Sequence, residues 1–99
     1  MKTIHKYEVP IEGRFSLQLP REAVILSFQC QNGIPAIWAE VETANSIQER
    51  WFRIYDTGQP IGNIPEYIGL HYIGMAKKKT DNGFGPEQVW HLFIEEVKK

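Results

Sequence analysis

The pair Asn32-Gly33 constrains the fold of this chain more than any other feature of its sequence. Both residues tolerate a positive φ, which the two central positions of the tightest β-hairpin turn require. A two-residue loop at this point places Gln31 opposite Ile34 and fixes the pairing of the flanking strands. Residues 23–43 are therefore predicted to form an antiparallel β-hairpin.

The apolar side chains predict the register of this hairpin. On the face expected to be buried, three apolar pairs oppose one another: Phe28 with Ile37, Leu26 with Ala39, and Val24 with Val41. A slip of one residue would turn the whole set toward water, because side chains alternate along a strand. The other face is predicted to carry Ile25, Ser27, Gln29, Gln31, Trp38, Glu40 and Glu42.

Further strands are predicted from the same alternation at residues 3–9, 16–19, 49–55 and 71–78. In the strand 49–55, Phe52 and Ile54 are expected in the core. Residues 58–65, which hold two Gly and two Pro, are predicted to be a loop, and residues 80–86 are rich in turn formers. The last segment fits both a helical stripe and a strand with Trp90, Leu92 and Ile94 on one face. We favour a strand as far as about Ile94, with a short C-terminal helix as the alternative.

These elements predict an all-β protein with a single domain over residues 1–99, folded as a small antiparallel sandwich or barrel. An α+β fold is the alternative if the C-terminal segment is helical. The single Cys30 excludes an internal disulfide framework and a cysteine-rich zinc site, and is expected to be a small buried hydrophobe. The N-terminal residues lack the apolar run of a signal peptide, and no membrane-length segment follows, so a cytosolic protein is expected.

The residues Asp56-Thr57-Gly58 directly follow a predicted strand. The catalytic Asp-Thr-Gly of an aspartic protease lies at the same place, at the end of an apolar strand. In such proteases a small residue follows the glycine, whereas Gln59 and Pro60 follow here. Asp-Thr-Gly is also ordinary turn chemistry, because Asp caps its own turn and Gly supplies a positive φ. We therefore predict a turn and no enzyme activity.

No cofactor or metal site is expected. His5, His71 and His91 are scattered, and their spacing predicts no metal triad. No glycine-rich phosphate loop and no nucleophile elbow occurs in the sequence. The net charge of −1 weighs against a nucleic acid as partner.

The candidate site is an aromatic face followed by a loop. Outward-pointing aromatic side chains together with an arginine are typical of protein interfaces and of base-stacking sites. The alternative is that this face is a second core, covered by the N-terminal strand or the C-terminal segment. The residues predicted to bind a ligand or partner are Trp38, Trp51, Arg53, Tyr55, Thr57, Gly58 and Gln59.

Several short motifs along nearly the whole chain resemble a family of small phage and prophage proteins of unknown function. The resemblance is carried by residues 2–7 and 19–23, by Gln29 and Gln31, by Trp38-Ala39 with Val41, by Glu49-Arg50 with Phe52, by Thr57-Gly58 with Pro60-Ile61, and by residues 72–74 and 90–93. The central loop of that family usually reads Gly-Thr-Gly-His-Pro-Ile, and here Asp56 and Gln59 replace its first Gly and its His. The resemblance implies a phage gene expressed in a bacterial cytoplasm and supplies no activity.

Two hypotheses for function follow. The first is a non-catalytic phage binding protein that counters host defence by sequestering a host protein or a nucleotide-like signal, held by Trp38, Trp51 or Tyr55 with Arg53 on the phosphate. The second is a structural or interaction subunit that self-associates through the aromatic face, which makes a homo-oligomer the expected state.

Overall fold

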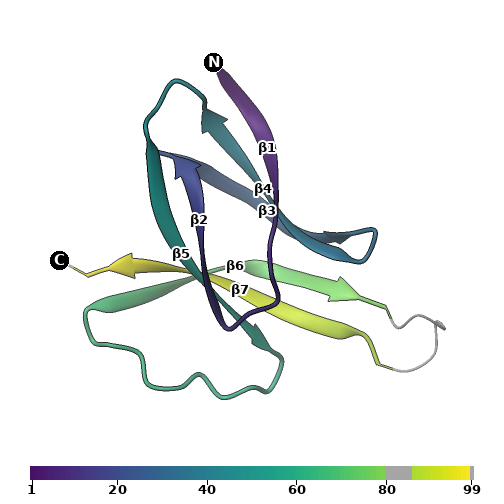
Figure 1. The fold of residues 1–99 in the computed structure, drawn as a ribbon. Helices are drawn as coiled ribbons and strands as arrows, with labels where there is room; N and C mark the ends of the chain where they lie inside the picture. The colour runs from purple at the N-terminus through teal and green to yellow at the C-terminus, as the bar shows by residue number, and fades with distance from the viewer. Residues whose placement is uncertain (80–85, 99) are drawn as a thin grey trace.

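The computed structural model describes residues 1–79 and 86–98, and these residues form two antiparallel β-sheets and no helix (Figure 1). The three-stranded sheet has the order β1-β4-β3, and the four-stranded sheet has the order β2-β5-β7-β6. The sheets pack face to face without closing into a barrel. The strands are β1 (Lys2–Glu8), β2 (Arg14–Pro20), β3 (Val24–Gln31), β4 (Ile34–Glu42), β5 (Ile47–Asp56), β6 (Ile68–Lys78) and β7 (Gln88–Val97).

The all-β prediction is confirmed. The structure also shows that the last segment, for which a strand and a helix were both considered, is a strand. Residues Gln88–Val97 form β7, three residues longer than the predicted end at Ile94. Trp90, Leu92 and Ile94 are buried on one face, as strand alternation predicts, so the helical alternative does not apply. The turn-rich prediction for residues 80–86 falls mostly on 80–85, which lie outside the described residues.

The predicted hairpin turn is confirmed. Asn32 and Gly33 have φ values of 53° and 78°, the pair of left-handed conformations that a type I′ turn requires. Gln31 pairs with Ile34 and Phe28 pairs with Ile37, as the sequence predicts. Phe28, Ile37, Ala39 and Val41 are buried.

The predicted register holds as far as Ser27 and is wrong beyond it, because β3 contains a bulge. Ser27 pairs with Trp38 and Ile25 pairs with Ala39, which leaves Leu26 as an extra residue without a partner. The extra residue exchanges the faces of the strand: Val24 and Leu26 are exposed, whereas Ile25 packs against the core.

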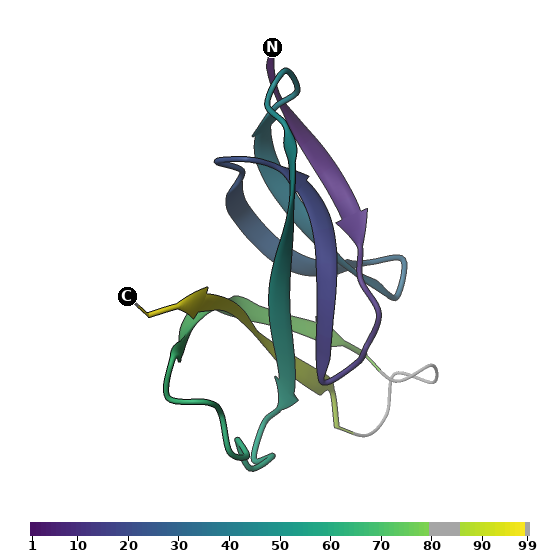
Figure 2. The ribbon, with the colours of Figure 1, turned by 60° about the vertical axis from the view of Figure 1, so that its left-hand side comes forward.

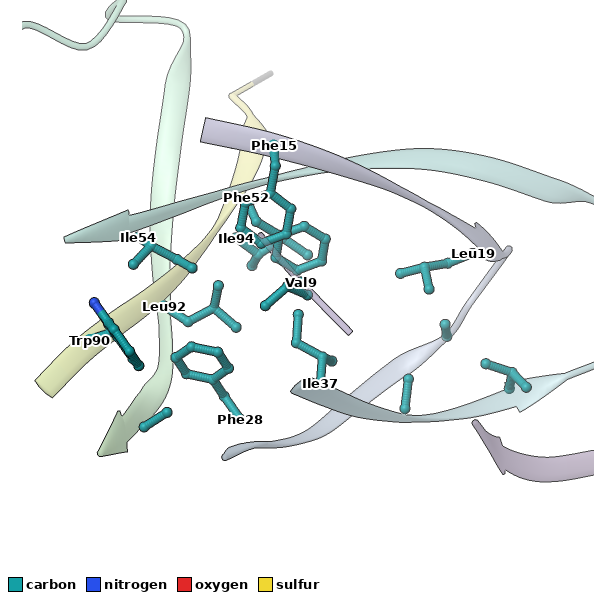
Figure 3. Close-up of a cluster of buried hydrophobic side chains, with 14 residues drawn as sticks. Val9, Phe15, Leu19, Phe28, Ile37, Phe52, Ile54, Trp90, Leu92 and Ile94 are labelled. Atoms are coloured by element: carbon teal, nitrogen blue, oxygen red, sulfur yellow. The ribbon is translucent and has the colours of Figure 1, made fainter. Parts of the chain in front are cut away.

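The core lies between the two sheets and draws on strands from both (Figure 3). The phenyl rings of Phe15 on β2 and Phe52 on β5 stack with their centroids 5.4 Å apart. Phe52 and Ile54 are buried, which confirms the predicted inward face of β5. Cys30 is half-buried at the edge of this core, and burial raises the pKa of its thiol. It is therefore a small apolar contact, as expected.

Strand β5 has different neighbours along its two halves (Figure 2). Strand β2 pairs with β5 from Ile47 to Arg53, whereas β7 pairs with it only from Phe52 to Asp56. Figure 1 shows the consequence: β2 and β5 run together, and β6 and β7 cross the far end of β5. This divergence of β5 and β7 positions the candidate site.

Candidate functional site

The structure divides the predicted site residues between two opposite faces of the molecule. Ile37 and Ala39 of β4 point into the core, so Trp38 lies on the outer face of the three-stranded sheet. Phe52 and Ile54 of β5 point into the same core, so the alternate residues of β5 lie on the outer face of the four-stranded sheet. Trp51, Arg53 and Tyr55 therefore share one face, and Trp38 does not belong to it.

Glu95 of β7 is the centre of the outer face of the four-stranded sheet. Arg14 donates two hydrogen bonds to its carboxylate, from Nε at 2.7 Å and from a terminal nitrogen at 3.0 Å. Arg53 donates a third, from Nε at 2.7 Å. The Glu95 side chain is only 5% exposed. We call Arg14, Trp51, Arg53 and Glu95 the Glu95 cluster.

This cluster resolves a repulsion that the strand register creates. Arg14 lies directly opposite Arg53 in the β2–β5 pair, and like charges at opposed positions destabilise a sheet. A carboxylate that accepts from both guanidinium groups removes the repulsion and joins β2, β5 and β7. Sequence reasoning missed Arg14 and Glu95 because they are 81 residues apart and no local pattern links them.

The electrostatics of the cluster follow from these hydrogen bonds. The hydrogen bonds from Arg14, which have the largest effect, and from Arg53 hold the pKa of the Glu95 carboxyl below its ordinary value of 4.5. Burial acts in the opposite direction and is outweighed. The hydrogen bonds to Glu95 likewise raise the pKa of both arginines. Glu95 is therefore ionised at neutral pH, and both arginines already have an anionic partner.

Trp51 is half-exposed, and two contacts fix its ring. The guanidinium carbon of Arg14 lies 4.0 Å from the centroid of the indole, within the range of a cation–π interaction. The indole N–H donates to a carboxylate oxygen of Glu49 at 3.1 Å. The ring is held in one orientation with part of its surface in solvent.

Tyr55 is mainly a structural residue. It is 8% exposed, and its ring meets Phe93 edge to face at a centroid distance of 5.8 Å. Tyr72 of β6, which was not among the predicted site residues, covers the other side of Phe93 at 5.1 Å and is 53% exposed. Tyr55 is thus covered by β7, the C-terminal segment, as the second-core alternative predicts for one of the aromatic residues.

The loop residues Thr57, Gly58 and Gln59 form a turn that closes on Asp56. The Gln59 N–H donates to the Asp56 carbonyl at 3.0 Å, and the Asp56 N–H donates to Oε1 of Gln59 at 2.9 Å. Gly58 has a φ of 85°, which favours glycine at this position. The turn is as predicted, but the side chain that caps it is that of Gln59, whereas Asp56 is exposed and takes part through its main chain.

His91 links this turn to the aromatic residues. Its Nε2 lies 2.7 Å from Oγ1 of Thr57, and its Nδ1 lies 2.9 Å from the hydroxyl of Tyr72. His71, by contrast, pairs with Glu96 at the molecular surface. Within residues 1–79 and 86–98, no three His, Cys, Asp or Glu side chains gather as metal ligands.

A cleft of about 540 Å³ opens beside Trp51, where β5 and β7 diverge. We call it the β5–β7 cleft. Its wall includes the guanidinium of Arg50, which donates to the carbonyl of Ala23 at 2.9 Å. The lining residues are Glu22, Ala23, Gln48, Glu49, Arg50, Trp51, Ile68, Glu95, Glu96 and Val97.

The central role of Glu95 predicts a specific loss of stability. Glu95→Gln removes the negative charge that pairs with both arginines, and we expect it to lower the free energy of unfolding by about 2 kcal/mol at pH 7. The expected loss is smaller than for a fully buried ion pair because Arg14 is half-exposed. Glu96→Gln, on the exposed neighbour, is the control and should change stability by less than about 0.5 kcal/mol. Urea denaturation measures both values.

The pH dependence checks the cause. A carboxyl with a lowered pKa stabilises the folded state above its unfolded pKa, and the contribution disappears as the pH falls through the folded pKa. The difference between the parent and Glu95→Gln should therefore be full at pH 7 and shrink below pH 4.5. A difference that persists unchanged at pH 2 to 3 would mean that the ion pairs do not cause it.

Comparison with known proteins places the chain in a family. No helix in the described residues could span a membrane. No curated protein and no solved structure matches the chain. Residues 1–99 match, over their whole length, a family described as a domain of unknown function, DUF7352. The all-β sandwich with its Glu95 cluster is thus the structure of a protein that belongs to the DUF7352 family.

Proposed function

We propose that this protein is a non-catalytic binding protein that captures a protein partner on the outer face of its four-stranded sheet. The observation that carries the proposal is the fixed position of Trp51, held between the Arg14 guanidinium and the Glu49 carboxylate. Trp, Tyr and Arg are the residues that most often dominate the free energy of protein association. A ring that is already ordered loses little conformational entropy on binding.

A nucleotide-like ligand is the competing proposal for the same face. Trp51 with an adjacent arginine suits the stacking of a base. Both arginines, however, already pair with Glu95, so a phosphate would have to compete with a buried carboxylate. This competition favours the protein partner. Heat released on titration with a panel of cyclic nucleotides would reverse the preference.

The biological setting is part of the proposal and rests on the resemblance to phage and prophage proteins. In that setting the gene belongs to a phage, the protein acts in the bacterial cytoplasm, and the captured partner is a host protein of a defence system. In the central loop the resemblance rests on Thr57, Gly58, Pro60 and Ile61, whereas Gln59 stands where that family has His.

Photo-cross-linking in bacterial cells tests the proposal. A photoreactive phenylalanine at Gln18, which lies beside Glu49 on the proposed face, should form an adduct with a second protein. The same replacement at Gln29, an exposed glutamine on the opposite sheet, is the matched control and should form none with that protein. Adding Trp51→Ala should weaken binding about 30-fold, as the loss of a hot-spot side chain does.

Two results would contradict the proposal. One is an adduct that forms equally well at positions 18 and 29, because non-specific contact has no preferred face. The other is an adduct at position 18 that Trp51→Ala leaves unchanged.

Self-association through the outer face of the three-stranded sheet is a second candidate function. Ile4 and Val24 flank Glu40 on this face and are 59% and 55% exposed, and Trp38 lies one row away. Exposed aliphatic side chains beside a tryptophan are typical of a surface that associates. A homo-oligomer would cover them.

Light scattering tests this second candidate. We expect the parent to have the mass of an oligomer and Val24→Lys to have the mass of a monomer, because a lysine beside Glu40 suits the fold but not an apolar interface. Ile61→Lys, at a similarly exposed loop residue, should leave the mass unchanged. A monomeric parent would remove self-association from consideration.

A further inference from the structure

The hydrogen-bond ladder between β5 and β7 stops part-way along β5. The pairing with β7 begins at Phe52, whereas the pairing with β2 covers Ile47 to Arg53. Within the part of the chain that the structure describes, residues 47–51 of β5 are paired with a strand on one side only. Their other side faces the β5–β7 cleft, which Gln48, Glu49, Arg50 and Trp51 line.

The direction of the main-chain groups can be traced along each strand. The Ile54 N–H donates to the Gly13 carbonyl at 3.2 Å, so the main-chain N–H and C=O of Ile54 point toward β2. The main-chain groups of successive residues in a strand point to opposite edges. Those of Arg50 therefore also point toward β2, and those of Glu49 point into the cleft. The Lys98 N–H donates to the Tyr67 carbonyl at 2.7 Å, on the β6 side. By the same alternation, the main-chain N–H and C=O of Val97 on β7 point into the cleft.

Two strand edges therefore present main-chain donors and acceptors to one cleft. The β5–β7 pairing does not extend to Glu49 or Val97, and no other main-chain bond satisfies them among the described residues. An exposed row of unpaired N–H and C=O groups is a template for one more strand. Proteins that bind extended peptides use this mode of strand addition.

The charges in the cleft indicate which kind of strand would fit. Of its four glutamates, Glu95 is neutralised by the two arginines and Glu96 pairs with His71. Glu22 and Glu49 form no ion pair with any described residue. Glu49 accepts hydrogen bonds only from uncharged groups, such as the Trp51 indole. Arg50 is the one cation among the lining residues and forms no ion pair with a described residue, so four glutamates against one arginine leave the lining with a net negative charge.

We propose that the β5–β7 cleft binds an extended basic segment of a partner protein, which adds as a strand along the edge of β5 at Glu49. This inference rests on the proposed function and names the chemistry of the partner. The open edge at residues 47–51 offers about 17 Å of strand, enough for roughly five residues. Lysine or arginine at alternate positions would pair with Glu49, and main-chain bonds would set the register.

Fluorescence anisotropy with short synthetic peptides tests this mode of binding. The probe is a labelled hexapeptide of alternating valine and lysine with blocked ends, and the charge control has glutamate in place of lysine. Two further peptides keep the valine–lysine sequence and carry N-methyl groups on every valine or on every lysine. We expect the parent peptide to bind, the glutamate peptide not to bind, and at least one N-methylated peptide to bind about tenfold more weakly or worse.

Variants of the protein locate the peptide. Glu49→Pro removes the N–H that faces the cleft without removing a bond to β2, and it should abolish binding. Because this variant could fail to fold, Glu22→Gly provides a second test. Glu22 has a φ of 68°, which glycine adopts without strain, so Glu22→Gly should be as stable as the parent and yet bind the peptide about threefold to tenfold more weakly. Glu12→Gly, outside the cleft, is the matched control.

Three results would overturn the inference. The first is equal binding of the parent peptide and both N-methylated peptides, which would show attraction by charge alone. The second is full binding to Glu22→Gly and to a folded Glu49→Pro, which would place the peptide elsewhere. The third is no binding of the valine–lysine peptide at all.

The cross-linking experiment separates this inference from the proposed function. An adduct at position 18 that depends on Trp51, together with no binding of any basic peptide, would mean that the partner is recognised by side chains and that strand addition is wrong. If no adduct forms at position 18 and no basic peptide binds, the proposed function is overturned as well.

Discussion

The structure depends on strand β5, which pairs with two neighbouring strands, β2 and β7, that run in different directions. Phe52 and Ile54 place its inner face in the core with residues of both sheets. Its first half pairs with β2 and its last residues pair with β7, so no straight, continuous four-stranded ladder is formed. The cleft lies where these two partners separate. The same feature therefore builds the core and leaves an open strand edge.

Glu95 holds this arrangement together on the outer face. Its carboxylate accepts from Arg14 on β2 and from Arg53 on β5, so three strands are joined by one nearly buried charge. Arg14 in turn covers the ring of Trp51. An ordered aromatic side chain, a satisfied charge cluster and an unsatisfied strand edge thus lie side by side, and this combination is what we interpret as a surface for a protein partner.

The sequence predicts the parts of this structure that depend on local geometry. The turn at Asn32-Gly33 and the inward faces of β5 and β7 follow from positive φ and from alternation with a period of two. The bulge at Leu26 does not, because one extra residue leaves the apolar pattern intact while exchanging the faces beyond it. The site was only partly predictable for a similar reason. Alternation places Trp51 and Arg53 on an outer face, but strand order decides that Glu95 and Phe93 are their neighbours.

Amide hydrogen exchange of the free protein, followed residue by residue by NMR, tests the open edge of β5 most directly. We predict that the Arg50 and Arg53 amides, bonded to β2 and β7 respectively, exchange slowly, whereas the Glu49 amide exchanges about as fast as in an unfolded chain. The contrast between the adjacent residues Glu49 and Arg50 is internal to one strand and needs no ligand. A Glu49 amide as well protected as that of Arg53 would show that β5 has a partner along its whole length, and would contradict this account.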